Sequence, residues 1–385
     1  MRREPVQYAT SGDLRIAYQE FGDGPMDLVV VPGFVSNLDM VWETPALAPT
    51  LERVGRFARC VVFDKRGTGL SDRDFGFGSL EERMDDIRAV VDHVGLARTA
   101  LLGISEGGPL SVLFAAAYPE RVTTMALYGT MARIRQGPGY PDGFDDSFIP
   151  SFLDEVERRW GTGDALRAFC QHIPKGNAEV TELVARYERG ACSPRMARHI
   201  LERNMDIDIL AVLPTVSAPT LVLHSSGDPL VPVSFGRHLA EGIPGARFVE
   251  HDADYHLTFR GRDAWFLDEL EKFFTGTEPT AALPTERFRA TVLFTDIVDS
   301  TQRAAGLGDR AWRDLLDRHD KISSDSVVAH GGRVVKTTGD GVLATLEGPS
   351  RTVKDLTVGS GLEFEDRGRH TLKGVPDEWE LFSLV

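Results

Sequence analysis

The amino-acid sequence predicts an α/β fold, in which a doubly wound, mostly parallel sheet carries a helical lid and is followed by a small α+β domain. Short apolar runs of strand length alternate with helical patterns through most of residues 1–275. This alternation is typical of a parallel sheet that helices cover on both faces. It stops between about 131 and 210, and a polar stretch with two prolines at 276–287 then separates residues 288–385 from the rest.

Seven runs rich in valine, leucine and isoleucine mark the strands, and each ends in a polar or glycine-rich turn. LRIAYQEF alternates as an exposed strand does, whereas MDLVVVPGF has the continuous apolar character of a buried strand. The seven runs begin at residues 14, 26, 58, 97, 122, 218 and 246. We expect the ligand site at the carboxyl ends of these strands, where α/β sheets bind their ligands.

Helical patterns fill the intervals between the strands. Across 79–94, apolar residues recur at helical spacing, and Ser79 with Glu82 fits a capping box. Residues 131–210 contain only helical patterns and loops, so we predict a lid over the carboxyl ends of the strands. A last helix at 263–274 precedes the linker 276–287.

Composition and charge exclude several classes of protein. The net charge of −15 disfavours nucleic acid and anionic membranes as partners, because both require basic patches. The three cysteines are scattered, without metal-site or disulfide spacing. The basic N-terminus lacks an apolar signal segment, and the apolar runs are far too short to span a membrane. We therefore expect a cytoplasmic protein.

The pentapeptide Gly103-Ile104-Ser105-Glu106-Gly107 matches the pattern G-x-S-x-G between a predicted strand and a predicted helix. In this context a sharp turn lifts the serine hydroxyl out of the sheet, and glycines allow the turn to be tight. The start of the following helix supplies backbone N–H groups for a developing oxyanion. We therefore predict that Ser105 is a nucleophile.

A nucleophilic serine needs a base, and the base needs a carboxylate that orients it. His256 lies just after the last predicted strand and Asp228 at the end of the strand before it, so both fall at the same sheet edge as Ser105. We predict a triad in the chain order Ser105, Asp228, His256. The alternative bases are His172, His224 and His238, and the alternative carboxylates are Asp252 and Asp254.

Residues 8–275 resemble the α/β-hydrolase superfamily. Besides the serine turn, the segment DKRGTGLS at 64–71 is similar to the family's D-x-R-G-x-G-x-S turn. The resemblance implies an oxyanion hole formed by the backbone N–H groups of Phe34 and Glu106. Pro32 stands where the family usually has histidine, and a proline fixes this loop differently. We expect Asp64 and Arg66 to hold their loop rather than contact the substrate.

The serine at position 105 narrows the chemistry, because dehalogenases and epoxide hydrolases of this superfamily carry aspartate there. Acyl transfer remains, by an esterase, lactonase, amidase, C–C hydrolase or perhydrolase. We predict a carboxylesterase-type serine hydrolase for small or medium esters, without a cofactor or a bound metal. Four apolar lid residues are expected to line its acyl pocket: Phe144, Phe148, Phe152 and Trp160. For Phe148 and Phe152, packing within the lid is the alternative.

Residues 288–385 resemble class III adenylate and guanylate cyclases through ATVLFTDIVDST, a long helical pattern and RVVKTTGDGVLATLE. The resemblance implies that Asp296 and Asp340 match the metal-holding carboxylates and that Lys336 matches the purine contact. The chain then passes directly from GVLATLEGPS to RTVKDLTVGSG, without the family segment that carries the transition-state asparagine and arginine. We therefore expect a truncated, ferredoxin-like remnant without cyclase activity.

Three interpretations of the whole chain follow, and we prefer the first. It is a serine hydrolase acting on a small-molecule ester, with a tail that serves homodimerisation because a shortened sheet leaves edges able to pair; a poorly packed appendage is the other interpretation of the tail. In the second, a hydrolase-like pocket senses a ligand and signals through the tail. In the third, the chain is a nucleotide cyclase, which the missing segment disfavours.

Overall fold

The structure of the chain is a computed structural model. It describes residues 1–44, 47–73, 78–169, 178–256, 264–277, 290–294, 300, 306, 308–329, 333–337, 342–347, 364–371 and 378–384. The chain divides into two compact units, Met1–Thr280 and Ala281–Val385.

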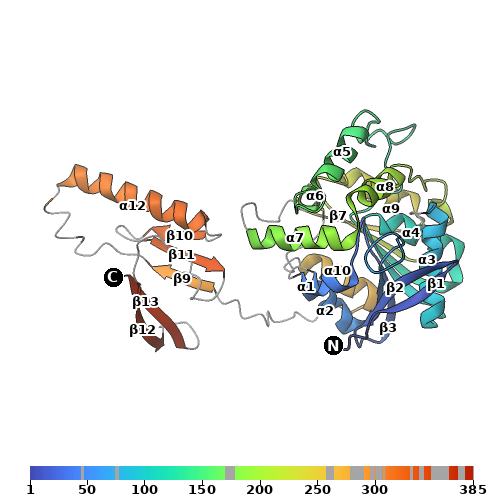
Figure 1. Cartoon of the computed structure of the whole chain (residues 1–385), viewed down its shortest axis with the longest axis horizontal. Helices are drawn as coiled ribbons and strands as arrows, with labels where there is room; N and C mark the ends of the chain where they lie inside the picture. Colours follow the sequence, from blue (N-terminus) through green and yellow to red (C-terminus); the bar gives the residue numbers. More distant parts are fainter. Residues whose placement is uncertain are drawn as a thin grey trace. The chain divides into compact units, whose positions relative to one another are not determined.

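An eight-stranded sheet forms the centre of the first unit (Figure 1). Its strands are β1 (Gln7–Ser11), β2 (Leu14–Phe21), β3 (Met26–Val31), β4 (Ala58–Phe63), β5 (Thr99–Ile104), β6 (Val122–Tyr128), β7 (Thr220–Ser225) and β8 (Arg247–His251). The spatial order is β1-β2-β4-β3-β5-β6-β7-β8, antiparallel from β1 to β4 and parallel from there on. The predicted parallel sheet is confirmed; β1, the edge strand, was not among the seven predicted runs.

Helices cover both faces of this sheet, as a doubly wound fold requires. They are α1 (Leu38–Glu43), α2 (Ala48–Phe57), α3 (Leu80–Val94), α4 (Gly107–Ala117), α9 (Val233–Gly242) and α10 (Ala264–Thr275). Alternate residues of β3 enter opposite cores: Val29 packs with residues of α3, α4 and α9, whereas Leu28 packs with residues of α2 and α10. The sheet therefore separates two hydrophobic layers and leaves its carboxyl edge for the site.

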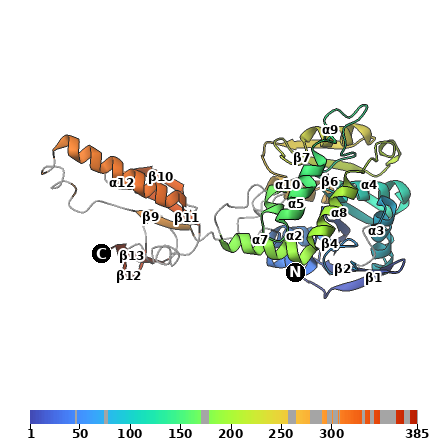
Figure 2. The ribbon, with the colours of Figure 1, turned by 45° about the horizontal axis from the view of Figure 1, so that its top comes forward.

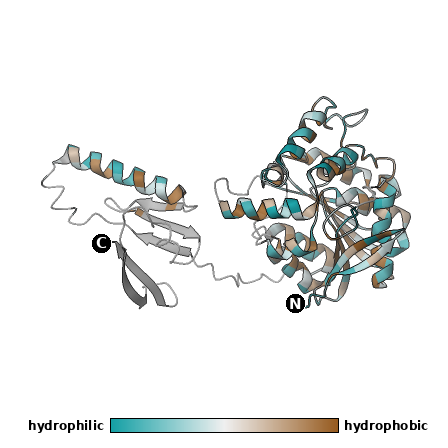
Figure 3. Cartoon of the chain, viewed as in Figure 1, coloured by the Kyte–Doolittle hydropathy of each residue, from teal (hydrophilic) through white to brown (hydrophobic). Residues whose placement is uncertain are grey.

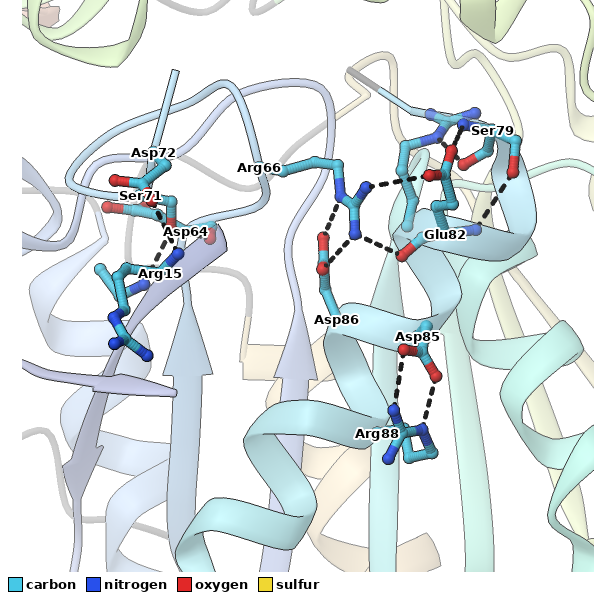
Figure 4. A network of polar contacts seen from close by, with 12 residues as sticks. Arg15, Asp64, Arg66, Ser71, Asp72, Ser79, Glu82, Asp85, Asp86 and Arg88 are labelled. Atoms are coloured by element: carbon cyan, nitrogen blue, oxygen red, sulfur yellow. Dashed lines mark hydrogen bonds and ion pairs between the residues drawn. The ribbon is translucent and has the colours of Figure 1, made fainter. Parts of the chain in front are cut away.

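Helix α3 begins and ends at the residues that its sequence signals indicate. The Ser79 hydroxyl accepts the backbone N–H of Glu82 at 3.2 Å, and the Glu82 carboxylate accepts the Ser79 N–H at 2.7 Å, so the predicted capping box is present (Figure 4). Gly95 ends the helix at φ +78°, a left-handed conformation that suits glycine. The helix therefore ends at Val94, and four residues separate it from β5 (Thr99–Ile104), the strand that leads into the serine turn.

Polar contacts hold the turn after β4, which contains Asp64 and Arg66 (Figure 4). The Arg66 guanidinium donates two hydrogen bonds to Asp86 of α3, at 2.8 and 2.7 Å. The Asp64 carboxylate accepts the backbone N–H groups of Leu38 at 3.1 Å and Leu70 at 2.9 Å. These two side chains join the turn to α1 and α3, which is the loop-holding role expected for them.

The fully buried Asp64 makes stability depend on pH. Burial raises the pKa of this carboxyl from 3.8 to about 6, so the folded chain binds the proton more tightly than the unfolded chain. The wild type should therefore lose stability as pH rises from about 4 to about 6. Asp64→Asn has no such carboxyl, so its free energy of unfolding in urea should not show this loss. The difference between variant and wild type should therefore shift by roughly 3 kcal/mol in favour of the variant from about pH 4 to about pH 6. A difference between the two proteins that stays constant with pH would contradict this expectation.

Among the described residues, four α-helices between β6 and β7 form the lid (Figure 2). They are α5 (Ile149–Arg159), α6 (Ala165–Phe169), α7 (Ala178–Ala191) and α8 (Pro194–Asn204). Brown and teal faces alternate around α7, as expected for a helix with one packed side (Figure 3). Helices α5 and α8 pack together and share a hydrophobic core distinct from the two sheet cores.

Glu188 of α7 holds the lid together from inside. Its side chain is fully buried and accepts backbone N–H groups of Gly161 at 2.7 Å, Gly163 at 2.8 Å and Leu166 at 2.8 Å. A carboxylate can accept all three, whereas a glutamine amide offers only one acceptor oxygen. The segment from α5 to α6 therefore depends on a side chain with two acceptor oxygens in the lid core.

Glu188→Gln is expected to lower the free energy of unfolding by about 2–4 kcal/mol, because at least one buried N–H group loses its acceptor. Denaturant unfolding followed by circular dichroism would measure the loss. The control is Glu182→Gln in the same helix, which removes the contact of an exposed carboxylate with Arg189 and should cost less than about 0.5 kcal/mol. Equal losses in the two variants would contradict the role of Glu188.

In the second unit, a three-stranded antiparallel sheet has the order β10-β11-β9. Its strands are β9 (Ala290–Phe294), β10 (Arg333–Thr337) and β11 (Val342–Glu347), and the helix α12 (Asp309–Ala329) lies between β9 and β10 in the chain. A separate pair of antiparallel strands consists of β12 (Phe364–Thr371) and β13 (Glu378–Leu384). Lys336 lies in β10, while Asp296 and Asp340 lie outside the described residues. Throughout the described residues of both units, no helix is long and apolar enough to cross a membrane.

Candidate active site

Ser105 lies at the turn between β5 and α4, where its backbone has φ +51°. Within the part of the chain that the structure describes, it is the one non-glycine residue with positive φ. Its N–H donates to the carbonyl of Tyr128 at 2.9 Å, and its own carbonyl accepts the N–H of Gly108 at 2.9 Å. A strained residue that its surroundings hold in place is a common feature of active sites.

The glycines of the pentapeptide are required by close backbone contacts. A Cβ atom at Gly107 would lie 2.1 Å from the carbonyl oxygen of Val31, and one at Gly103 would lie 2.6 Å from the hydroxyl of Ser111. Neither gap accommodates a carbon atom. The turn can therefore pass against β3 and α4 only with glycine at both positions.

The structure brings Ser105, His256 and Asp228 together from three separate segments. The Nε2 atom of His256 lies 3.0 Å from the Ser105 hydroxyl, and its Nδ1 atom lies 2.7 Å from Asp228 Oδ2. All three residues are buried. This is the arrangement in which an imidazole can take the serine proton while a carboxylate fixes its orientation.

Backbone groups orient Asp228 in turn. Its Oδ1 atom accepts the N–H groups of Leu230 and Val231, each at 2.9 Å, which leaves Oδ2 for His256. His224, which the sequence also offers as a base, bonds through Nε2 to the carbonyl of Val231 at 2.8 Å and lies 3.6 Å from Asp228 Oδ2. Burial lowers the pKa of His224, so this imidazole is a neutral neighbour of the carboxylate.

The remaining candidate bases and carboxylates do not contact Ser105 in the described part of the chain. His238 on α9 bonds through Nδ1 to the carbonyl of Ser234 at 2.7 Å. Asp252 is exposed and accepts the Ser226 hydroxyl at 3.4 Å, and Asp254 is exposed as well. His172 lies outside the described residues. Among the described histidines, His256 alone contacts the Ser105 hydroxyl.

The two residues expected to supply the oxyanion hole flank Ser105. Glu106 follows it directly at the start of α4. The loop containing Phe34 passes close by, because a Cβ atom at Gly33 would lie 3.1 Å from Ser105 Cβ. The side chains of Lys65, Arg83 and Asn204 meet the Glu106 carboxylate at this point. The sequence did not indicate these contacts, since no local pattern links residues so distant in the chain.

A cavity of about 400 Å³ opens onto Ser105 and His256. Its lining includes lid residues, residues of α1 and α2, and one residue of β3: Phe144, Phe148, Phe152 and Leu201 of the lid, Leu38, Val41 and Leu51 of α1 and α2, and Val30 of β3. Phe148 is 50% exposed, so it belongs to the mouth as well as the wall. Trp160 does not line the cavity as expected; it packs edge-on against Phe34 and donates to the carbonyl of Cys192.

Several known hydrolases are similar to this chain in sequence or fold. A putative carbamate hydrolase of Caulobacter is 27% identical over 247 residues, covering 61% of this chain and 87% of that protein. The mouse serine hydrolase BPHL is 26% identical and covers 64% of this chain and 79% of that protein. The solved esterase RhEst1 of Rhodococcus is 25% identical, with a TM-score of 0.58 over 70% of this chain and 98% of that one.

The profile of the alpha/beta hydrolase fold family matches residues 28–260. This range spans β3 to β8, the lid, Ser105, Asp228 and His256. It excludes the second unit, so the cyclase resemblance of the tail gains no support from it. The chain is a member of the α/β-hydrolase fold family.

Proposed function

We propose that this enzyme hydrolyses carboxylic esters of small or medium size through an acyl-enzyme formed on Ser105. The observation that carries the proposal is the continuous contact from the Ser105 hydroxyl through His256 to Asp228, at 3.0 and 2.7 Å. It lies at the wall of a largely apolar cavity. These contacts are those that a nucleophile, its base and an orienting carboxylate need for acyl transfer, and they support the proposal.

The proposed reaction proceeds in two halves. Ser105 Oγ attacks the ester carbonyl as His256 Nε2 takes the hydroxyl proton, and the backbone N–H groups of Phe34 and Glu106 bind the resulting oxyanion. Collapse of this intermediate breaks the bond to the alcohol, which leaves with the proton from His256. Water then attacks the acyl-enzyme with His256 again as base, and the carboxylic acid and free Ser105 result.

The cavity walls favour a substrate that is apolar on both sides of its ester bond. Phe144 and Phe152 of the lid line the cavity, as do Leu38 of α1 and Leu51 of α2. One part can receive an acyl chain while the other receives the alcohol. A cavity of about 400 Å³ suits substrates of this size.

The test is hydrolysis of p-nitrophenyl esters from acetate to octanoate, together with labelling by a fluorophosphonate. We expect turnover that rises with chain length until the acyl part of the cavity is filled, and labelling at Ser105. A wild type that neither turns over these esters nor reacts with the fluorophosphonate would contradict the proposal. Labelling without ester turnover would redirect it to amide or carbon–carbon bonds.

We further propose that the second unit mediates homodimerisation and takes no part in the chemistry. All three triad residues belong to the first unit, while α12 of the second exposes the apolar side chains of Ile322 and Val328. Light scattering of the full chain and of Ile322→Lys would measure the assembly. A monomeric wild type, or an Ile322→Lys variant that dimerises equally well, would count against this role.

A further inference from the structure

Lys65 is buried beside the serine turn, with only 1% of its side chain exposed. Its ammonium lies 3.0 Å from Glu106 Oε2 and donates hydrogen bonds to the carbonyl oxygens of Gly33 and, at 3.3 Å, of Phe34. An ammonium group has three protons, and these three acceptors match them. The lysine therefore connects the loop expected to carry one oxyanion donor with the residue that carries the other.

Two further side chains, Arg83 and Asn204, hold the Glu106 carboxylate that Lys65 contacts. The Glu106 carboxylate also accepts Arg83 of α3 at 2.9 Å and Asn204 of α8 at 2.7 Å, and Arg83 donates to Asn204 Oδ1 at 2.9 Å. The side chains of Arg83 and Glu106 are 3% and 4% exposed. Two buried basic side chains, Lys65 and Arg83, thus share the Glu106 carboxylate close to Ser105.

The bond from Lys65 to the Gly33 carbonyl sets the direction of the next N–H group. The carbonyl of Gly33 and the N–H of Phe34 belong to the same peptide unit, and in a trans peptide they point in opposite directions. An ammonium that holds the oxygen on one side therefore turns the N–H of Phe34 to the other. Its positive charge also polarises the peptide and strengthens that N–H as a donor.

We propose, on the basis of the ester hydrolysis proposed above, that Lys65 is the positioning residue of the oxyanion hole. It orients the Gly33–Phe34 peptide so that the N–H groups of Phe34 and Glu106 converge on the oxyanion. Glu106 holds Lys65 in turn and is itself fixed by Arg83 and Asn204. This side-chain link fixes the loop that contains Pro32, where the family usually has histidine.

The test compares Lys65→Met with the wild-type full chain on p-nitrophenyl butyrate. Active sites are counted by fluorophosphonate titration, so that unfolded protein does not enter the rate. Loss of an oriented oxyanion donor should lower kcat per active site roughly 10- to 100-fold and change KM less than about twofold. The affinity for a trifluoromethyl ketone, which forms an oxyanion on the serine, should fall by the same factor as kcat/KM.

Arg83→Met is the matched control, because it removes an equally buried cation from the same carboxylate. Arg83 donates to Glu106, Asn204 and the Ser79 carbonyl rather than to the Gly33–Phe34 loop. Glu106 keeps its contacts with Lys65 and Asn204 in this variant, so the loss of kcat per active site should be much smaller. Lys65→Arg keeps the charge and the hydrogen-bond donors, so it should recover part of the activity that Lys65→Met loses. It also provides the test if Lys65→Met folds poorly.

Each outcome separates the two proposals. Equal losses in Lys65→Met and Arg83→Met would assign the effect to the lost charge and overturn the positioning role. An active wild type with an unchanged Lys65→Met would overturn it as well, while leaving ester hydrolysis in place. A wild type without turnover or labelling would overturn both.

Discussion

Ser105→Ala is expected to reduce kcat for p-nitrophenyl butyrate by roughly 10⁴- to 10⁶-fold and to abolish fluorophosphonate labelling. The hydroxyl lies 3.0 Å from His256 Nε2, and a methyl group removes the nucleophile without disturbing the imidazole, which Asp228 holds from the other side. The cavity walls stay intact, so ester binding should change little. Stopped-flow or spectrophotometric release of p-nitrophenol gives the rate.

Ser111→Ala is the control for this variant. Ser111 is buried in α4, close to the same turn, but its hydroxyl donates to the carbonyl of Gly107 at 2.7 Å rather than contacting His256. Its replacement should reduce kcat no more than a few-fold. If Ser105→Ala retains the activity of Ser111→Ala, the hydrolysis does not proceed through Ser105.

Asp228→Asn is expected to reduce kcat by roughly 10³- to 10⁴-fold. The N–H groups of Leu230 and Val231 point at Oδ1, so an asparagine must place its carbonyl oxygen there and its NH₂ group toward His256. An amide that donates to Nδ1 forces the ring proton onto Nε2, where a base needs a free lone pair. The variant should therefore fold normally and hold the wrong tautomer of His256.

Asp252→Asn provides the comparison, because Asp252 is exposed and follows β8 on the way to His256. Its kcat should stay within about twofold of the wild type. A severe loss in Asp252→Asn combined with a mild one in Asp228→Asn would transfer the orienting role to the other carboxylate. The ring ¹⁵N resonances of His256 would report the tautomer directly.

Local chemistry made much of this fold predictable from the sequence. The capping box at Ser79 and the glycines around Ser105 act over a few residues, so their sequence signals suffice to place α3 and the turn. The carboxyl ends of parallel strands share one edge, and this places Asp228 and His256 near Ser105 even though 151 residues separate His256 from Ser105. Chain order and strand pattern together thus predicted that these three side chains meet, as they do in the structure.

The contacts that sequence patterns did not reveal are those between distant side chains. Asn204 reaches Glu106 across 98 residues, and Arg83 reaches Asn204 across 121. No periodicity or turn rule relates such pairs, because the way the lid packs onto the turn determines them. Trp160 was misplaced for the same reason: its aromatic character suits a cavity wall and a lid core equally well, and only packing decides between them.

The positive φ of Ser105 means that the side chain proposed for catalysis lowers the stability of the fold. A glycine at position 105 would adopt the same backbone at lower cost, so the Ser105→Gly protein should be more stable by roughly 1 kcal/mol. A mutant library screened for heat resistance alone would accordingly enrich chains that lack the Ser105 hydroxyl. Selection for thermostable variants of this protein must therefore include an activity assay in every round.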